Sequence, residues 1–381
     1  MKPEADLRSV GRILWKAAGL YLAANLAFGL LDPLPFLGRI SIYNTLVPGR
    51  ARLPYAEDPD LAYNLSVDLI EPMLASHEVS APPPSDEYRV FILGDSSVWG
   101  FLLHPEQTLA GQLSQQGIRL PDGRRLRAYN FGYPVMSLLK DLTLLDSLRS
   151  YSPDLVIWMV SLEAFPYDKQ LASALLQSQP EAPRALIQAY SLPISLTSPE
   201  LALPSFWERT IVGRRRELAD LVRLQLYGVM WAATGIDQHY PDAYDLRSVN
   251  LTDDLRFHGM EPPDLTRSAL AMEVLAAGDQ MLDDIPLVII NEPIFISSGQ
   301  NSHLRYNDLY PRWAYDEYRR LLADACAEEG WACHDYWDAI APDEFTNTAI
   351  HLTPAGTQAL ARLVGQAVLK AAGPSGEAGG E

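Results

Sequence analysis

The sequence predicts an α/β protein built on a parallel sheet, with helices on both faces in a three-layer, flavodoxin-like arrangement. Short apolar runs alternate along the chain with segments whose apolar residues recur every three or four positions. One run, residues 154–160, is apolar almost throughout, as expected of a strand that is covered on both faces. This alternation is typical of parallel strands joined by right-handed helical crossovers.

Length and composition narrow the classes of protein to which this chain can belong. The chain has 381 residues, of which 48% are hydrophobic, and this is enough to bury a sizeable core. Its formal net charge of −18 excludes nucleic acid as an expected partner, because phosphate contacts need a basic face. The two cysteines, Cys326 and Cys333, make neither a zinc site nor a disulfide framework. They could form one bridge in an exported domain, but we expect unpaired core thiols.

An apolar stretch near the N-terminus follows several basic residues and precedes Asp32. Residues 13–31, with Lys16 reaching toward the headgroups, are just long enough to span a bilayer. The basic residues before this segment predict a cytoplasmic N-terminus and an extracytoplasmic domain. We therefore expect a membrane anchor. A cleaved signal peptide, with small residues near Ala23 and Ala27, and a buried soluble helix are the alternatives.

Composition divides the chain into five parts. A stiff linker, Ala81-Pro-Pro-Pro-Ser85, predicts the start of the α/β core directly after it. A long stretch between the third and fourth predicted strands is interpreted as a helical lid or a partner-binding subdomain. The predicted parts are a cytoplasmic stub and anchor (1–31), a juxtamembrane segment and linker (32–85), the core (86–165 and 285–372), the helical insertion (166–284) and a disordered tail (373–381).

Periodicity places the individual elements. Strands are predicted at 90–93, 126–131, 154–160, 287–290 and 331–334, and core helices at 108–115, 138–148, 315–329 and 357–370. The insertion is expected to hold helices at 170–177, 183–190, 207–231 and 270–282. One further short helix is predicted at 65–71, where Pro72 would stop it.

A cluster of arginines stands out in the insertion of this acidic chain. Its members are Arg209, Arg214, Arg215, Arg216 and Arg223. They could recognise an anionic substrate group or lipid headgroups. The interpretation that we favour is a solvated helix face, on which the arginines pair with Glu208, Glu217 and Asp220.

The turn Gly94-Asp95-Ser96 ends the first predicted strand. Gly94 permits a sharp turn, and Asp95 and Ser96 favour turns and helix caps. Ser96 would lie at the carboxyl end of a strand, where open α/β sheets bind their ligands. It is therefore a candidate nucleophile if a base can reach it, and a simple helix cap if none can.

The candidate base is at the far end of the chain. His351 precedes Thr353-Pro-Ala-Gly356, which begins the last predicted helix, and from there it could take a proton from Ser96. This order of blocks resembles the SGNH or GDSL-type hydrolase family, whose first block is a Gly-Asp-Ser and whose last block carries the catalytic His. The resemblance covers roughly residues 88–165 and 285–370 and implies the same flavodoxin-like fold.

The resemblance also implies an oxyanion hole. The N–H groups of Ser96 and Gly132 fit two of its three donors. The third family donor is an asparagine after the third strand, but here that position holds Glu163, which cannot donate a hydrogen bond when ionised. Either burial raises the pKa of Glu163, or the hole is built differently, or hydrolysis is not the activity.

The group that orients His351 departs from the family as well. The family places an aspartate three residues before the histidine, but here that residue is Thr348. Asn347 can hold the imidazole tautomer by a hydrogen bond, although it carries no charge. Asp343 or a backbone carbonyl could serve instead, and a Ser-His dyad remains chemically workable.

A polar stretch, residues 291–307, follows the fourth predicted strand and suits a polyhydroxylated ligand such as a sugar. Asn291 or Asn301 could replace the missing oxyanion amide, and Glu292 beside Glu163 would form a carboxylate pair of the glycosidase kind. The alternative is a polar loop that bonds to itself. The candidate substrate-binding residues are Asp95, Asn130, Glu163, Asn291 and Glu292.

The sequence contains no metal-ligand spacing, phosphate loop or dinucleotide fingerprint, so we expect no metal and no cofactor. The resemblance implies a membrane-anchored serine hydrolase that acts on O-acyl groups of cell-envelope glycans or on small esters. An O-acyltransferase using the same serine is one alternative, with a membrane acyltransferase as a candidate partner. A catalytically silent member that binds a glycan or a partner is the other.

Overall fold

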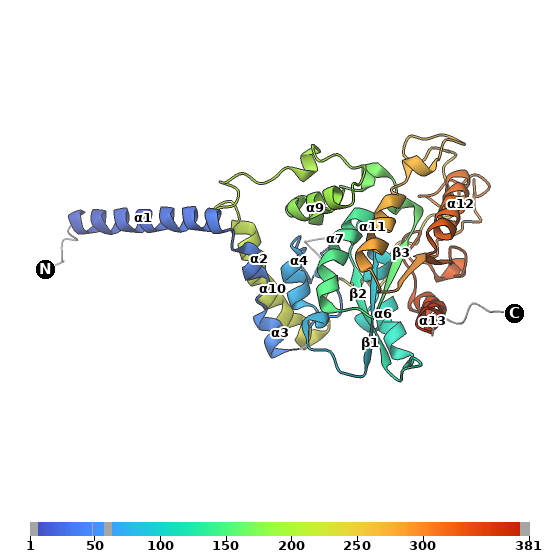
Figure 1. The fold of residues 1–381 in the computed structure, drawn as a ribbon, viewed down its shortest axis with the longest axis horizontal. Helices are drawn as coiled ribbons and strands as arrows, with labels where there is room; N and C mark the ends of the chain where they lie inside the picture. The colour runs from blue at the N-terminus through green and yellow to red at the C-terminus, as the bar shows by residue number, and fades with distance from the viewer. Residues whose placement is uncertain (1–6, 48, 57–62, 374–381) are drawn as a thin grey trace.

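The computed structural model describes residues 7–47, 49–56 and 63–373 and contains one five-stranded sheet (Figure 1). All of its strand pairs are parallel, and the strand order is β2-β1-β3-β4-β5. This is the flavodoxin-like order, so the predicted fold class is confirmed. The strands are β1 (Glu87–Gly94), β2 (Arg125–Gly132), β3 (Leu155–Val160), β4 (Leu287–Asn291) and β5 (Ala332–Asp335).

The sheet is covered on both faces because its strands are apolar on both. In β1, Phe91 and Leu93 pack into one hydrophobic cluster, whereas Val90 and Ile92 pack into the other. The first cluster lies under α7 (Leu138–Leu148), α11 (Met272–Leu282) and α12 (Arg312–Glu329). The second lies under α6 (Leu109–Gln115) and α13 (Pro354–Ala371). These three layers bring the carboxyl ends of the strands to one edge of the sheet.

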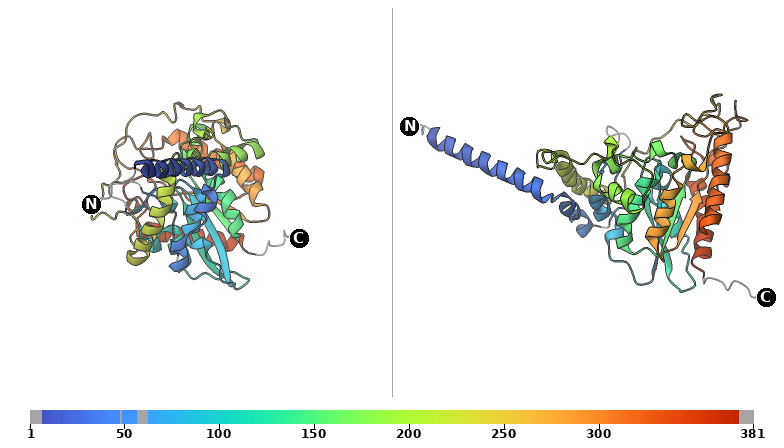
Figure 2. Two further views of the ribbon diagram at one scale, coloured as in Figure 1. Left: turned by 90° about the vertical axis from the view of Figure 1, so that its left-hand side faces the viewer. Right: turned by 45° about the horizontal axis from the view of Figure 1, so that its top comes forward.

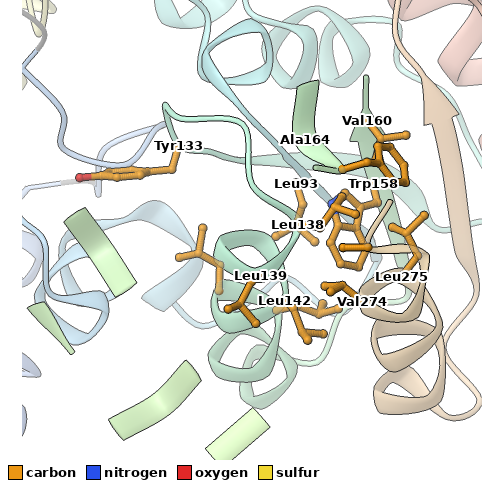
Figure 3. Close-up of a cluster of buried hydrophobic side chains, with 14 of the residues drawn as sticks. Leu93, Tyr133, Leu138, Leu139, Leu142, Trp158, Val160, Ala164, Val274 and Leu275 are labelled. Carbon is orange, nitrogen blue, oxygen red and sulfur yellow. The ribbon is translucent and has the colours of Figure 1, made fainter. Parts of the chain in front are cut away.

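Trp158 lies at the centre of the first cluster, between β3 and the helices α7 and α11 (Figure 3). Its ring is fully buried, and its indole N–H donates a hydrogen bond of 3.1 Å to Asp141 Oδ2. Gly278 of α11 packs against the ring so closely that an added Cβ would lie 2.4 Å from Trp158 Cζ3. The approach of α11 to the sheet therefore depends on a residue without a side chain.

The N-terminal elements lie beside this core. The long helix α1 (Leu7–Leu31) leaves the domain on one side, and α2 (Leu34–Gly38), α3 (Ile42–Leu46) and α4 (Ile70–Ser76) follow it (Figure 1). Within α1, Ser9–Leu31 is long and apolar enough to cross a membrane by length and composition, although a signal sequence would pass the same test. Residues 1–6 of the predicted stub and 374–381 of the predicted tail lie outside the described residues.

Three helix predictions need correction. The helix predicted at 170–177 begins only at Ala174, as α8 (Ala174–Ser178). The helix predicted at 65–71 is instead α4, which begins at Ile70 and continues through Pro72, because a proline in the first turn removes no intrahelical hydrogen bond. The helix predicted from residue 207 begins only at Arg215, as α10 (Arg215–Thr234). The preceding turn packs on itself, with Gly213 against the Glu208 carbonyl. The remaining helices are α5 (Ser96–Trp99) and α9 (Glu181–Ala189).

Cys326 and Cys333 form a disulfide, so the expectation of unpaired thiols is wrong. The αL turn at Gly330 ends α12 and returns the chain into β5, which brings the two Cα atoms to 6.2 Å. That separation lies within the usual range for a disulfide. Disulfides persist mainly in oxidising compartments, so this bond bears on localisation.

We predict that Gly278→Ala destabilises the protein. The added methyl group must displace the buried Trp158 ring, and this cost outweighs the better helix propensity of alanine, for a net loss of roughly 1–2 kcal/mol. The free energy of unfolding, measured by chemical denaturation, checks this. Gln280→Ala, at an exposed position of the same helix, is the matched control. Equal stability of the two variants would show that α11 does not depend on this contact.

Candidate active site

Ser96 is presented by a tight turn between β1 and α5. A Cβ on Gly94 would lie 2.6 Å from Val98 Cγ2, so only glycine fits where the strand ends. Asp95 is the N-cap of α5, and its Oδ1 accepts a hydrogen bond of 2.8 Å from the Ser97 N–H. Asp95 therefore forms the turn, and the Ser96 side chain takes no part in capping the helix.

Ser96 and His351 meet across the sheet edge. Ser96 Oγ lies 2.9 Å from His351 Nε2, and His351 Nδ1 lies 3.0 Å from Asn347 Oδ1. Because the Asn347 oxygen can only accept a hydrogen bond, Nδ1 carries the proton. Nε2 then accepts a hydrogen bond from the Ser96 hydroxyl. The structure thus brings together the three residues Ser96, His351 and Asn347. Thr348 instead accepts a hydrogen bond of 3.1 Å from the His351 backbone N–H and shapes the turn.

The surroundings of His351 keep its imidazole neutral. The ring is buried and stacks on Phe101, with the ring centroids 5.0 Å apart and the planes 7° from parallel. Burial lowers the pKa of His351 to about 4. At neutral pH the imidazole can therefore accept a proton, but among the described residues its Nδ1 faces Asn347 rather than a carboxylate that would stabilise the imidazolium. Phe101 escaped the sequence analysis because nothing in its spacing links it to His351.

The two predicted oxyanion donors belong to α5 and to the end of the neighbouring strand β2. The Ser96 N–H is at the first position of α5, where a helical N–H has no intrahelical acceptor. Gly132 packs so tightly on α5 that an added Cβ would lie 2.2 Å from the Trp99 nitrogen. Its N–H, however, donates a hydrogen bond of 3.0 Å to Asn130 Oδ1. The buried Asn130 side chain also donates to the Val98 carbonyl at 2.8 Å, so it fastens β2 to α5.

Glu163 is an ionised carboxylate. It follows β3, pairs with Lys169 Nζ at 2.8 Å and lies 3.2 Å from His258 Nε2. Burial alone would raise the pKa of Glu163, but hydrogen bonds from His258 and Lys169 outweigh it and hold the pKa below its usual value. The alternative of a carboxyl group kept neutral by burial is therefore wrong. His258 bonds through its other nitrogen to Asp168, 2.7 Å away.

Glu292 lies behind the serine turn and apart from the contacts of Glu163. It is buried and accepts a hydrogen bond from the Ser97 hydroxyl. Burial, together with the nearby Asp95, raises the pKa of Glu292 well above its usual value. The structure thus places Glu292 in support of α5, and its described contacts do not include Glu163, as a glycosidase pair would require.

Lys140 holds the end of β1 in place. Its Nζ is fully buried, donates a hydrogen bond of 2.8 Å to the Gly94 carbonyl and lies 2.8 Å from Asp141 Oδ1. Burial raises the pKa of Asp141 to about 6. The sequence analysis missed this pair. Its signal is two adjacent charged residues on a helix that also buries six leucines.

The polar side chains of residues 291–307 bond to protein groups, both within the stretch and in other segments. Asn291 donates to Asp335 Oδ1 at 2.8 Å and accepts from Tyr315 and Tyr318, so both ends of its buried side chain hold protein groups. Asn301 donates to the Leu251 carbonyl at 2.8 Å. Both asparagines thus bond to segments outside the stretch, whereas Asn307 donates to the Phe295 carbonyl within it at 2.9 Å. Neither Asn291 nor Asn301 is directed at Ser96.

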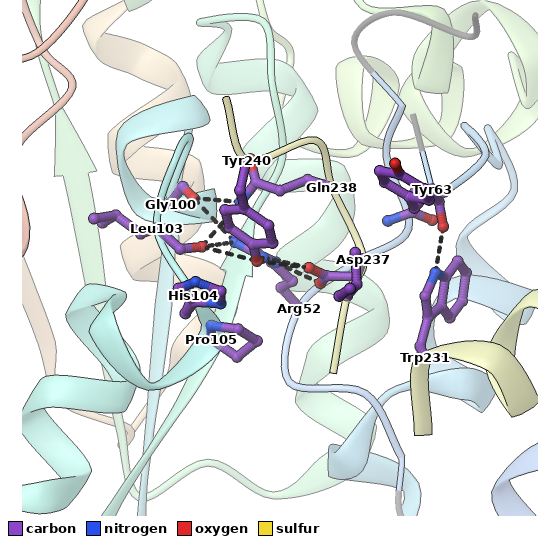
Figure 4. A network of polar contacts seen from close by, with 12 residues as sticks. Arg52, Tyr63, Gly100, Leu103, His104, Pro105, Trp231, Asp237, Gln238 and Tyr240 are labelled. Carbon is purple, nitrogen blue, oxygen red and sulfur yellow. Dashed lines mark hydrogen bonds and ion pairs between the residues drawn. The ribbon is translucent and has the colours of Figure 1, made fainter. Parts of the chain in front are cut away.

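A buried arginine organises the loop that follows α5 (Figure 4). Arg52 donates hydrogen bonds to the carbonyls of Gly100 at 2.9 Å and Leu103 at 3.0 Å, and another of 2.6 Å to Asp237. Its guanidinium also lies over the Trp99 ring, 4.4 Å from the centroid. Sequence reasoning could not find this network because its members come from three distant parts of the chain.

Comparison with known proteins finds no matching family model and no matching curated protein. Similar solved structures include the aryl esterase of M. smegmatis (13% identity, 74% of this chain and 99% of that one, TM-score 0.34). A catalytic mutant of the acetylxylan esterase Axe2 from Geobacillus stearothermophilus is similar at 12% identity (76% and 95%, TM-score 0.34). Est24, a carbohydrate acetylesterase from Sinorhizobium meliloti, is similar at 13% identity (74% and 98%, TM-score 0.32). These proteins are of the esterase kind that the motifs resemble, but TM-scores near 0.3 establish no activity.

We predict that Asn347→Asp raises esterase activity and shifts its pH dependence. In the wild type, activity should fall only as the pH drops through about 4, because the base must be neutral and burial lowers the pKa of His351. A carboxylate at residue 347 would raise that pKa, move the fall in activity to higher pH and increase kcat/KM by roughly tenfold or more. Hydrolysis of a p-nitrophenyl ester across pH checks this, and Asn347→Ala, which removes the hydrogen bond, should lower the rate. An identical pH profile in wild type and Asn347→Asp would exclude His351 as the base.

Proposed function

We propose that the protein is a membrane-anchored serine esterase of the SGNH/GDSL type. The observation that carries this proposal is the chain of hydrogen bonds from Ser96 through His351 to Asn347, with 2.9 and 3.0 Å between the bonded atoms. A nucleophile, a base and a group that orients the base at these distances form the arrangement that nucleophilic acyl transfer requires.

The reaction would run in two steps. Ser96 Oγ attacks the ester carbonyl carbon while His351 Nε2 accepts the hydroxyl proton, and the same imidazole then gives that proton to the leaving alkoxide. The acyl group is now bound to Ser96. Water, deprotonated by His351, attacks this acyl-enzyme, and the proton returns to Ser96 as the carboxylic acid leaves.

The N-terminal end of α5 would stabilise the oxyanion. We assign this role first to the Ser96 N–H, which has no intrahelical acceptor. The Gly132 N–H would join it if the oxyanion competes with Asn130 Oδ1 for the hydrogen bond. The charge of Glu163 is offset by its partners Lys169 and His258, so it opposes a developing oxyanion less than a bare carboxylate would.

O-acyl groups of cell-envelope glycans are the substrate class that we infer. Two features support a site outside the cytoplasm: the apolar helix Ser9–Leu31 and the disulfide between Cys326 and Cys333. An esterase that acts on a soluble ester inside the cell would need neither the apolar helix nor the disulfide. The sequence resemblance supplies the acyl-glycan part of this inference.

Transfer of the acyl group to a sugar is the second candidate. The feature that favours it is that His351 Nδ1 faces the uncharged Asn347 where the family has a carboxylate. A base of low pKa activates water weakly. An acyl-enzyme that resists water could pass its acyl group to a bound hydroxyl.

The first test is labelling of the full chain with a fluorophosphonate probe. We expect wild type to be labelled and Ser96→Ala to lose all labelling. His351→Ala should reduce labelling by about 10³-fold or more, because the serine loses its base. Ser97→Ala is the matched control, since that hydroxyl bonds to Glu292 rather than to His351. No labelling of folded wild type would overturn the serine-hydrolase proposal.

A second measurement distinguishes water from a sugar hydroxyl as the acceptor of the acyl group. With a labelled acetyl ester as donor, an esterase releases labelled acetate at the same rate whether or not glycan is present. A transferase places the label on the added glycan, and Ser96→Ala abolishes it. The same result in wild type and Ser96→Ala would exclude both roles for this serine.

A further inference from the structure

One side of α10 is apolar, yet it is exposed to solvent. Leu224, Gly228 and Trp231 form its inner stripe and are buried against the protein. Val222, Leu226 and Val229 form an outer stripe at the spacing of one helix face, and Leu226 is 65% exposed. A helix that is apolar on two sides needs a second apolar environment.

The neighbours of α10 continue this apolar surface. Helix α3 packs on α10 through the Tyr43 ring, which lies against Gly228. Helix α3 also exposes 73% of Leu46, and α2 exposes 68% of Phe36. We call the surface formed by α2, α3, residues 203–212 and α10 the anchor face.

The end of α1 is fixed to this same face. The Phe206 ring lies 3.1 Å from the Cβ position of Gly29, and Asn25 Oδ1 accepts a hydrogen bond of 3.1 Å from the Val212 N–H. Beside Phe206, the Trp207 side chain is 68% exposed. Exposed tryptophans close to the end of a membrane helix are typical of the headgroup layer.

We propose that the anchor face rests in the interfacial layer of a phospholipid bilayer. Helix α1 points away from this face, and α2, α10 and α3 lie along the side from which it leaves (Figures 1 and 2). If α1 crosses the bilayer, the anchor face meets the membrane surface, with the outer stripe of α10 in the acyl boundary. The inference rests on the proposed role of α1 as a membrane anchor.

Apolar contact rather than headgroup charge carries this docking. Arg214 pairs with Glu217 at 3.0 Å and Arg223 with Asp220 at 2.8 Å, so the interpretation of the arginines as a paired helix face is confirmed for these two residues. Arg215 instead donates a hydrogen bond to the Val212 carbonyl at 2.8 Å, and the Arg216 side chain is 89% exposed, 4.0 Å from Asp220. Paired arginines attract anionic lipids weakly. Docking is therefore expected on zwitterionic as well as on anionic membranes.

Docking would also orient the active site. Asp237 follows α10 and bonds to Arg52, which holds the carbonyls of Gly100 and Leu103 just after α5 (Figure 4). The anchor face and the serine turn are thus joined through one buried side chain. The membrane would hold Ser96 in a fixed orientation relative to its surface.

Site-directed fluorescence on the full chain tests the proposal. Both native cysteines are in a disulfide, so a single introduced cysteine can carry an environment-sensitive NBD probe. The positions are Leu226→Cys on the anchor face, Leu20→Cys within α1 and Gln280→Cys on α11. Each variant is reconstituted in phosphatidylcholine vesicles with and without doxyl-labelled lipid, in which the quencher lies near the headgroup for residues 226 and 280 and deep in the acyl chain for residue 20.

The three positions separate the outcomes. We expect blue-shifted, quenched emission at residues 226 and 20 and unchanged emission at 280, with the same result when part of the lipid is phosphatidylglycerol. Quenching at 20 without quenching at 226 would overturn the docking proposal, leave the anchor in place and favour a protein partner for the face. No quenching at 20 would overturn both the anchor and the docking, whatever the labelling of Ser96 shows.

Discussion

The hydrogen bond between Ser96 and His351 joins residues that are 255 positions apart, and most of the described core serves to make it. Parallel pairing sets Gly94 of β1 beside Gly132 of β2, which fixes the turn that carries Ser96. Lys140 holds the Gly94 carbonyl from one side, and Asn130 holds the carbonyl of Val98 from the other. On the histidine side, the Thr353 N-cap fixes where α13 begins. A shift in any of these supports would lengthen a contact that is useful only near 3 Å.

Burial has two opposite effects on this site. It strengthens each hydrogen bond by excluding water, and it makes every charge costly unless a partner offsets it. His351 responds by staying neutral, whereas Glu163 stays charged because Lys169 and His258 surround it. Asn347 supplies orientation without charge, which suits a neutral imidazole at rest but leaves the imidazolium without a counter-ion. The missing aspartate therefore bears on the rate of proton transfer more than on the geometry.

Local sequence patterns correctly predicted the features that depend on neighbouring residues alone. The leucine period of residues 138–148 matches α7 at both ends, and the two outer blocks led directly to Ser96 and His351. The sequence could not reveal contacts that depend on the packing of distant segments, such as Arg52 with Asp237. It also misjudged Cys326 and Cys333, because their pairing depends on how the turn at Gly330 returns the chain. Glu163 was found as a departure from the family, but its charge state became clear only with its partners in place.

The pairing of Arg52 with Asp237 shows how the N-terminal part and the active site are related. A buried ion pair contributes little net stability, since desolvation offsets much of its attraction. Its value is therefore geometric: one guanidinium fixes two carbonyls after α5 and the chain that leaves α10. If α1 crosses a membrane, as we propose, this contact would also hold Ser96 at a set height above the bilayer.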